Sequence, residues 1–266
     1  MAASATFLNL FQNEFLVFLL VLTRISALVM TAPIIGPRSV PIKIRVLLAG
    51  GISLLLAPAY GHTTILEPNS LVDLILLLIP EALWGVSIGL AIMILFAGFH
   101  VTGQIAGQMS GLQLADVFDP GFDSNVPILA RLLDLVALAV FVTTSGHRRV
   151  IAALLDSFQT MPPGNAHFSE SLVTALVNVT ARSFEIGIRV AAPVMIALLL
   201  SVLIMGLISR TLPQLNIIAV GFSFNTMVML SMMLVSISAL SWILEIDTQL
   251  ALEQIQTAIQ QAISKT

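Results

Sequence analysis

Six apolar runs of unequal length constrain the fold of this chain more than any other feature of its sequence. A helix needs about 20 apolar residues to cross the hydrocarbon core of a bilayer, so the second and fourth runs are short for a span and the third is long. The pattern predicts an all-helical membrane protein in which several helices are kinked or broken. The runs lie at residues 15–32, 46–60, 71–99, 128–142, 186–208 and 217–244.

Charged side chains are too few to cover a water-soluble fold. Asp, Glu, Lys and Arg make up 9% of the 266 residues and hydrophobic residues make up 58%, whereas roughly a quarter of a typical soluble domain is charged. A net charge of -3 without any block of basic residues argues against a nucleic-acid partner. The chain has no cysteine, which excludes disulfides, thiolate nucleophiles and Cys-ligated metals.

Proline is expected to make the apolar runs irregular. Pro58, Pro80 and Pro193 lie within or at the edge of such runs, where each removes a backbone donor and tends to kink or stop a helix. No Lys or Arg precedes Arg24, so the first run lacks the basic start of a signal peptide and is expected to be retained. Basic loop residues are divided about evenly between the two sides, which leaves the orientation open. We predict one domain over residues 1–266.

Charged groups inside the apolar runs need partners, because a bare charge in hydrocarbon is costly. Arg24 and Glu81 have no obvious local partner, so we expect a bond between helices or between subunits. Asp73 and Asp134 are further charges inside the apolar runs, and Asp134 is expected to be buried like Arg24 and Glu81. Helical spacing predicts two local ion pairs, Arg131 with Asp134 and Glu185 with Arg189.

A glycine-lined helix face is predicted just after the third run. Gly103, Gly107 and Gly111 recur every four residues, and Gln104 and Gln108 lie beside them. On a helix this spacing forms a groove without side chains, in which a second backbone can approach closely. The pattern does not decide between packing within the chain and docking of a neighbouring subunit.

The segment at residues 111–127, here called the connecting segment, has an unusual composition for a loop. Its Asp-Pro-Gly sequence is a strong turn signal, yet large apolar side chains alternate with carboxylates. Such a loop suits a constriction, because apolar side chains can seal a narrow space against water and ions. The acidic spacing does not match a calcium loop. The residues that we assign to this seal are Gly111, Leu112, Leu114, Asp116, Val117, Phe118, Asp119, Pro120, Gly121 and Phe122.

No catalytic, metal or cofactor pattern is present in the sequence. It contains no HExxH, GxSxG or P-loop sequence, and its four histidines are far apart along the chain. The C-terminal tail has Ile255, Ile259 and Ile263 at successive i+4 positions, which predicts an amphipathic helix that packs on its own bundle, on the membrane interface or on another subunit. A polytopic secondary transporter of a small solute is the alternative function for such a chain.

Several landmarks, taken in order along nearly the whole chain, resemble the FliR family, the flagellar type III export-gate proteins, and their SctT, EscT and SpaR relatives in virulence secretion. Where the family commonly has a second glycine before the histidine, this chain has Ser145. The landmarks are RISALVMTAPIIGPRSVPIKIR at 24–45, Glu81 with Gly85 and Gly89, GQIAGQMSG followed by FDP at 118–120, SGH at 145–147, SFQTMPPG at 157–164 and LPQLNIIAVGF at 212–222.

The resemblance implies a non-enzymatic subunit of the flagellar basal body in the bacterial inner membrane, with part of the assembly on the periplasmic side. It implies a hetero-oligomer with the gate subunits FliP and FliQ, with FlhB attached, that passes unfolded flagellar substrates. It further implies a FliP-like part over about 1–185 and a FliQ-like helical hairpin with its tail over about 186–266. By position and motif, the family's pore plug carries over to residues 111–127.

Overall fold

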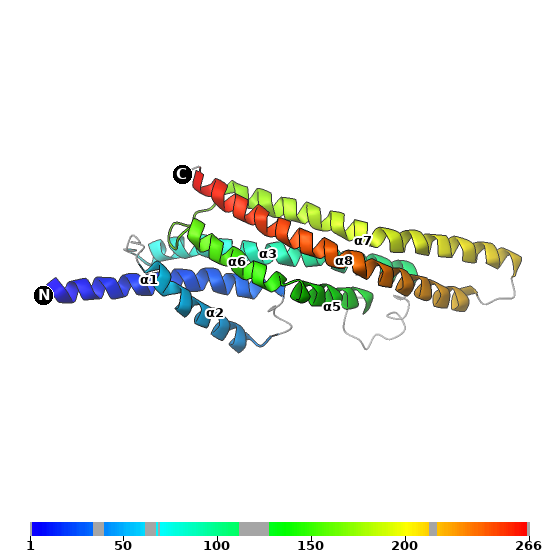
Figure 1. Cartoon of the computed structure of the whole chain (residues 1–266), viewed down its shortest axis with the longest axis horizontal. Coiled ribbons are helices and arrows are strands. Elements are labelled where there is room, and N and C mark those ends of the chain that lie inside the picture. The colour runs from blue at the N-terminus through cyan, green and yellow to red at the C-terminus, as the bar shows by residue number, and fades with distance from the viewer. Residues whose placement is uncertain are drawn as a thin grey trace. The chain divides into compact units, whose positions relative to one another are not determined.

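The computed structural model describes residues 2–33, 40–61, 68, 70–111, 128–212 and 217–264. Over these residues the chain is helical and has no strand (Figure 1). The elements are α1 (Ala2–Thr31), α2 (Ile42–Leu56), the short 3-10 helix η2 (Ala57–Tyr60), α3 (Leu71–Ser110), α5 (Ile128–Thr143), α6 (Gly146–Thr160), α7 (Glu170–Thr211) and α8 (Ile217–Ser264).

Four of the described helical stretches are long and apolar enough to cross a membrane, and α5 and α6 make a fifth if the bent pair counts as one span. The sixth apolar run lies inside α8, where the shorter stretch Val220–Ser236 is apolar. The predicted all-helical membrane class is therefore confirmed. The four stretches are Gln12–Thr31, Ile42–Tyr60, Leu71–Ser110 and Glu170–Thr211.

The prolines act differently from one another. Pro58 lies in the first turn of η2, directly after α2 ends, as expected for a residue that cannot continue a helix. Pro80 and Pro193 instead lie inside α3 and α7, which are 40 and 42 residues long. Of the two predicted effects, a kink or a stop, the stop does not occur at these two positions. Packed membrane helices tolerate such prolines because neighbouring groups satisfy the freed carbonyls.

The chain divides into two compact units. Unit 1 contains Met1–Met93, His147–Val179 and Gln249–Thr266, and unit 2 contains Ile94–Gly146 and Thr180–Thr248. Each unit is assembled from segments that are distant in the sequence, because α3, α7 and α8 each contribute one part to unit 1 and one part to unit 2.

The core of unit 1 is built around α1. Val17, Leu20, Val21 and Ile25 are fully buried along one face of this helix, as helical periodicity requires. Gly85 lets α3 approach this face closely, because a Cβ at Gly85 would overlap the backbone of α1. The absence of a side chain at this position therefore sets the spacing between α1 and α3.

The C-terminal tail packs inside unit 1, which decides among the three alternatives left by its sequence. Ile255 and Ile259 are almost completely buried. Ser171 Oγ donates to the carbonyl of Ala258 at 2.9 Å, and His167 Nε2 lies 3.1 Å from the carbonyl oxygen of Ala262. In Figure 1 the tail is the red end of α8, which runs antiparallel to the beginning of α7.

The core of unit 2 forms where parts of α3, α5, α7 and α8 meet. Phe99, Phe141 and Leu198 are fully buried there. The α3 and α7 backbones approach at Gly98 and Gly187, and Thr102 Oγ1 donates to the carbonyl of Gly187 at 2.8 Å. Small residues at such a crossing are typical of membrane helices.

Both units expose large apolar side chains. In unit 1, Leu47 and Leu55 on α2 are 75% and 81% exposed. In unit 2, Leu207 on α7 and Leu234 on α8 are 69% and 72% exposed. Apolar surface of this extent marks contact with lipid or with other proteins.

Candidate functional site

A buried ion pair organises unit 1. The Arg24 guanidinium donates from Nε to Glu81 Oε2 at 2.7 Å, and both side chains are at most 1% exposed. Arg24 Nη1 donates to the carbonyl of Ser157 at 3.0 Å, and the Gly164 amide donates to Glu81 Oε1 at 2.9 Å. The guanidinium also lies 4.3 Å from the ring centroid of Phe158. The pair therefore connects α1, α3, α6 and the turn that follows α6.

The sequence marked Arg24 and Glu81 as buried charges but did not predict the groups that surround them. Ser157 and Gly164 are the first and last residues of the SFQTMPPG landmark. Gly164 has a backbone φ of 88°, a left-handed conformation that favours glycine. The Pro-Pro-Gly sequence could have pointed to this contact, because it predicts a turn, and the backbone amides of a turn are free to bond to groups outside a helix.

The connecting segment starts and ends in unit 2. At its start, α3 ends at Ser110, and Gly111 follows with a φ of 81°, the left-handed conformation that commonly ends a helix. Gly111 therefore does not extend the helical glycine face, contrary to the predicted spacing pattern. At the other end, α5 begins at Ile128. The predicted seal residues from Leu112 to Phe122 lie outside the described residues.

The glycine face is used for packing within the chain at Gly103. A Cβ added there would overlap Cα of Ala130 and would lie 2.9 Å from its backbone nitrogen. Gly107 is also buried, whereas Gln108 is exposed. The close approach at Gly103 brings α3 against the first turn of α5, so the two helices that flank the connecting segment are packed together.

Asp134 has a different partner from the one its spacing predicted. Its Oδ2 lies 2.8 Å from His100 Nδ1 on α3, so the hydrogen bond joins two helices. The predicted partner, Arg131, is exposed one turn earlier on α5. The other predicted local pair is confirmed, with Arg189 Nη2 2.6 Å from Glu185 Oε1.

The position where the chain departs from the family pattern has a strained backbone. Ser145, between α5 and α6, has a φ of 59° and is the non-glycine residue with positive φ among the described residues. A side chain is disfavoured in this region. Gly146 follows, and a Cβ there would lie 2.5 Å from the Phe141 ring. Glycine would therefore suit both positions of this bend.

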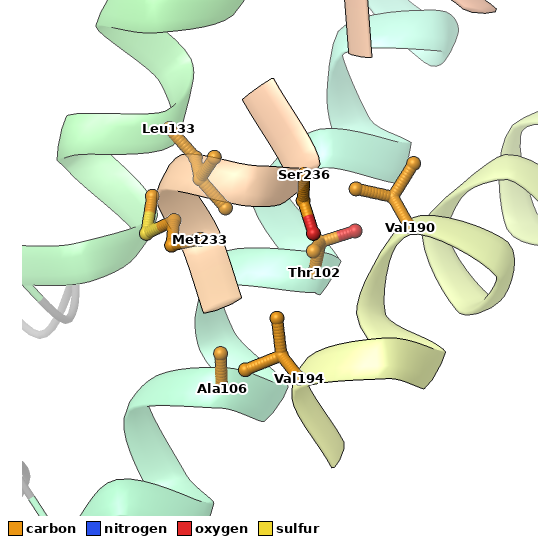
Figure 2. A pocket seen from close by; sticks show the side chains of 7 residues that line it. All are labelled: Thr102, Ala106, Leu133, Val190, Val194, Met233 and Ser236. Carbon is orange, nitrogen blue, oxygen red and sulfur yellow. The ribbon is translucent and has the colours of Figure 1, made fainter. Parts of the chain in front are cut away.

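Among the described residues no group of three or more His, Asp or Glu side chains could hold a metal ion. In unit 2 a cavity of about 10 Å³ lies between α3, α5, α7 and α8 (Figure 2). That is the space of about one water molecule, far below the roughly 300 Å³ or more of a typical small-molecule pocket.

These features define a class: an all-helical membrane protein that joins its helices through close glycine contacts and interhelical polar pairs. Comparison with known proteins narrows this class. The family model described as bacterial export proteins, family 1, matches residues 15–250. The flagellar biosynthetic protein FliR of Escherichia coli K12 is 34% identical over 212 residues, which cover 80% of each chain.

Two further relatives carry the same name. FliR of Pectobacterium carotovorum is 35% identical over 199 residues, covering 75% of this chain and 76% of the relative. FliR of Caulobacter vibrioides is 29% identical over 238 residues, covering 89% and 95%. The chain belongs to the bacterial export proteins, family 1, and is a membrane-embedded component of the flagellar export apparatus.

Proposed function

We propose that this chain is a subunit of a hetero-oligomeric export gate and that its connecting segment, residues 111–127, plugs the closed pore. Unfolded flagellar proteins pass through the pore when the plug is displaced. The observation that carries the proposal is the composition of the segment: apolar side chains for a seal, with a turn and carboxylates that oppose permanent burial.

The geometry of unit 2 supports this role. The segment leaves α3 after Ser110 and re-enters α5 at Ile128, and these helices are packed together at Gly103 and Ala130. A loop that begins and ends on two closely packed helices has fixed attachment points. Such anchoring suits a plug, which must return to the same position after each passage of substrate.

The exposed apolar helix faces support membership in an assembly. The exposed side chains on α2, α7 and α8 exceed what a chain bundled only with itself would leave uncovered in water. In the proposal, FliP and FliQ subunits cover part of these faces, FlhB attaches to the assembly, and lipid covers the rest. The segments 1–185 and 186–266 act as a FliP-like part and a FliQ-like hairpin with its tail.

The proposed location is the bacterial inner membrane at the flagellar basal body, with part of the assembly on the periplasmic side. The chain itself catalyses no reaction in this account. It supplies wall and plug, and the energy for transport comes from other components of the apparatus.

Ion leakage through the assembled gate tests the plug. Deleting residues 112–122 removes the proposed seal, so potassium efflux from vesicles containing the complete gate should rise at least tenfold. Replacing Leu112, Leu114, Val117, Phe118 and Phe122 with Ser should have a similar effect. The matched control replaces Asp116, Asp119 and Asp123 with Asn and should leave the leak low, because the apolar side chains remain. Equal efflux from the deletion and the parent would refute the plug.

Mass measurement of the complex in mild detergent tests the assembly. We expect small hydrophobic partner subunits to co-purify with this chain. A lone or self-associated chain that transports a solute would instead support the secondary transporter.

A further inference from the structure

Three contacts between α3 and α5 follow one another toward the connecting segment. The rings of Phe96 and Phe141 pack edge to face with centroids 5.6 Å apart. Next come His100 and Asp134, 2.8 Å apart, and then the backbone contact of Gly103 with Ala130. Along this series the residue numbers rise on α3 and fall on α5, so the two helices run antiparallel. We call these two helix ends the stems of the connecting segment, because one lies at each end of it.

The middle contact is a polar cluster of three side chains. A carboxylate can only accept, so His100 Nδ1 carries the hydrogen that it donates to Asp134 Oδ2. Gln104 Nε2 lies 3.3 Å from His100 Nε2. Both ring nitrogens of one imidazole are therefore engaged, one across the helix interface and one along α3.

Four other charged groups of unit 2 are engaged with one another. On α7 and α8, Arg182 bonds to both Glu185 and Asp247, and Arg189 bonds to Glu185. These groups have partners of their own. Asp134 is the charged side chain of α5 that contacts α3 beside His100.

We propose that His100, Gln104 and Asp134 form a latch, a set of positioning residues that holds the stems of the connecting segment together. This inference rests on the proposed plug function and extends it. The side chains of His100 and Asp134 are 29% and 40% exposed, so separating them costs far less than separating a fully buried pair. The latch sets how readily the stems part and hence how readily the plug is displaced.

Substitutions in the assembled gate test the latch. His100→Leu and Asp134→Leu should each raise potassium efflux by up to about fivefold, the change expected when a half-exposed charged contact is lost. The double variant should leak no more than either single variant, since both remove the same bond. His100→Asn should stay close to the parent because its amide nitrogen can occupy the position of Nδ1. His100→Gln places its donor farther out and should leak.

The matched control is Arg189→Gln, which breaks a charged contact on α7 in the same unit. It should leave the leak unchanged and the yield of complex intact. Leakage from Arg189→Gln equal to that from His100→Leu would overturn the latch, because any lost charge contact would then have the same effect.

A distance measurement separates the latch from the plug. The chain has no cysteine, so spin labels can be placed uniquely at Gln108→Cys on α3 and Leu132→Cys on α5. Within the complex, His100→Leu should add a longer distance population that His100→Asn lacks. Unchanged distances in His100→Leu overturn the latch. Lengthened distances, combined with a deletion of residues 112–122 that does not leak, uphold the latch and refute only the plug.

Discussion

The Arg24–Glu81 pair of unit 1 and the His100–Asp134 pair of unit 2 each join two helices, and they differ in burial and in the number of groups that support them. Arg24 and Glu81 are at most 1% exposed and engage Ser157 and Gly164 as well as each other. The His100 and Asp134 side chains are 29% and 40% exposed, and Gln104 is the further partner of His100. The first pair resembles a structural joint, and the second resembles a contact that can open and close.

Physical chemistry explains why these pairs suit different tasks. Removing one member of a fully buried pair leaves an uncompensated charge, so such a pair holds a fixed geometry. A half-exposed pair exchanges its bond for bonds to water at small cost. The comparison predicts that unit 1 keeps its arrangement through a transport cycle, while the α3 and α5 stems of unit 2 can separate.

The largest expected effect is at Glu81. Glu81→Ala leaves the Arg24 guanidinium buried without a carboxylate, which should cost about 3–5 kcal/mol of unfolding free energy. Thermal unfolding of the detergent-solubilised protein and the yield of folded chain measure this cost. The double variant Arg24→Met with Glu81→Leu should recover much of the loss, since no bare charge remains.

Asp134→Ala provides the direct contrast. Because Asp134 is 40% exposed, its loss should cost about 1 kcal/mol or less of unfolding free energy. The same thermal unfolding assay checks this value. If Glu81→Ala and Asp134→Ala destabilise the protein equally, the distinction between a fixed joint and an opening contact is wrong.

The second-largest effect on the unfolding free energy is expected at two closely packed glycines, one near the Arg24–Glu81 pair and one near the His100–Asp134 pair. Gly85→Ala places a Cβ against the α1 backbone, and Gly103→Ala places one against Ala130. Overpacking of this kind should cost about 1–3 kcal/mol. Gly206→Ala on α7 is the matched control, with no atom within 4 Å of the new Cβ, and should stabilise the helix by about 0.5–1 kcal/mol. A Gly103→Ala variant as stable as the Gly206→Ala control would mean that the stems are already loosely packed.

A small stabilising effect is expected at the bend between α5 and α6. Ser145 has a backbone φ of 59°, a conformation that is unfavourable for a residue with a Cβ. Ser145→Gly removes the Cβ and should raise the unfolding free energy by about 1 kcal/mol. Ser145→Ala is the comparison, because it removes the hydroxyl but keeps the Cβ and should bring no gain. A stabilisation by Ser145→Ala equal to that by Ser145→Gly would point to the hydroxyl rather than to the backbone.

Composition and apolar runs were sufficient to predict the helical membrane class, because both follow from local hydrophobicity. The charges Arg24, Glu81 and Asp134 could be marked as needing partners for the same reason. Their partners could not be assigned, since spacing along one helix reveals only local neighbours. Asp134 illustrates this limit: Arg131 was the partner within reach of its own helix, and tertiary packing brought His100 instead.

Long-range packing also determines whether the prolines stay inside helices and which groups approach the glycines. Pro80 and Pro193 remain inside helices because a packed neighbourhood can offset a local preference. The glycine spacing predicted a close backbone approach, but only the fold identifies Ala130 as the group that approaches Gly103. The composition of the connecting segment still carries the proposal for its role.

A density map of the closed assembly in a lipid environment tests the central claim most directly. The account predicts that residues 112–122 occupy the lumen through which substrates pass, with their apolar side chains filling its cross-section. Density for these residues outside the lumen, on a surface that faces solvent or lipid, would contradict the account.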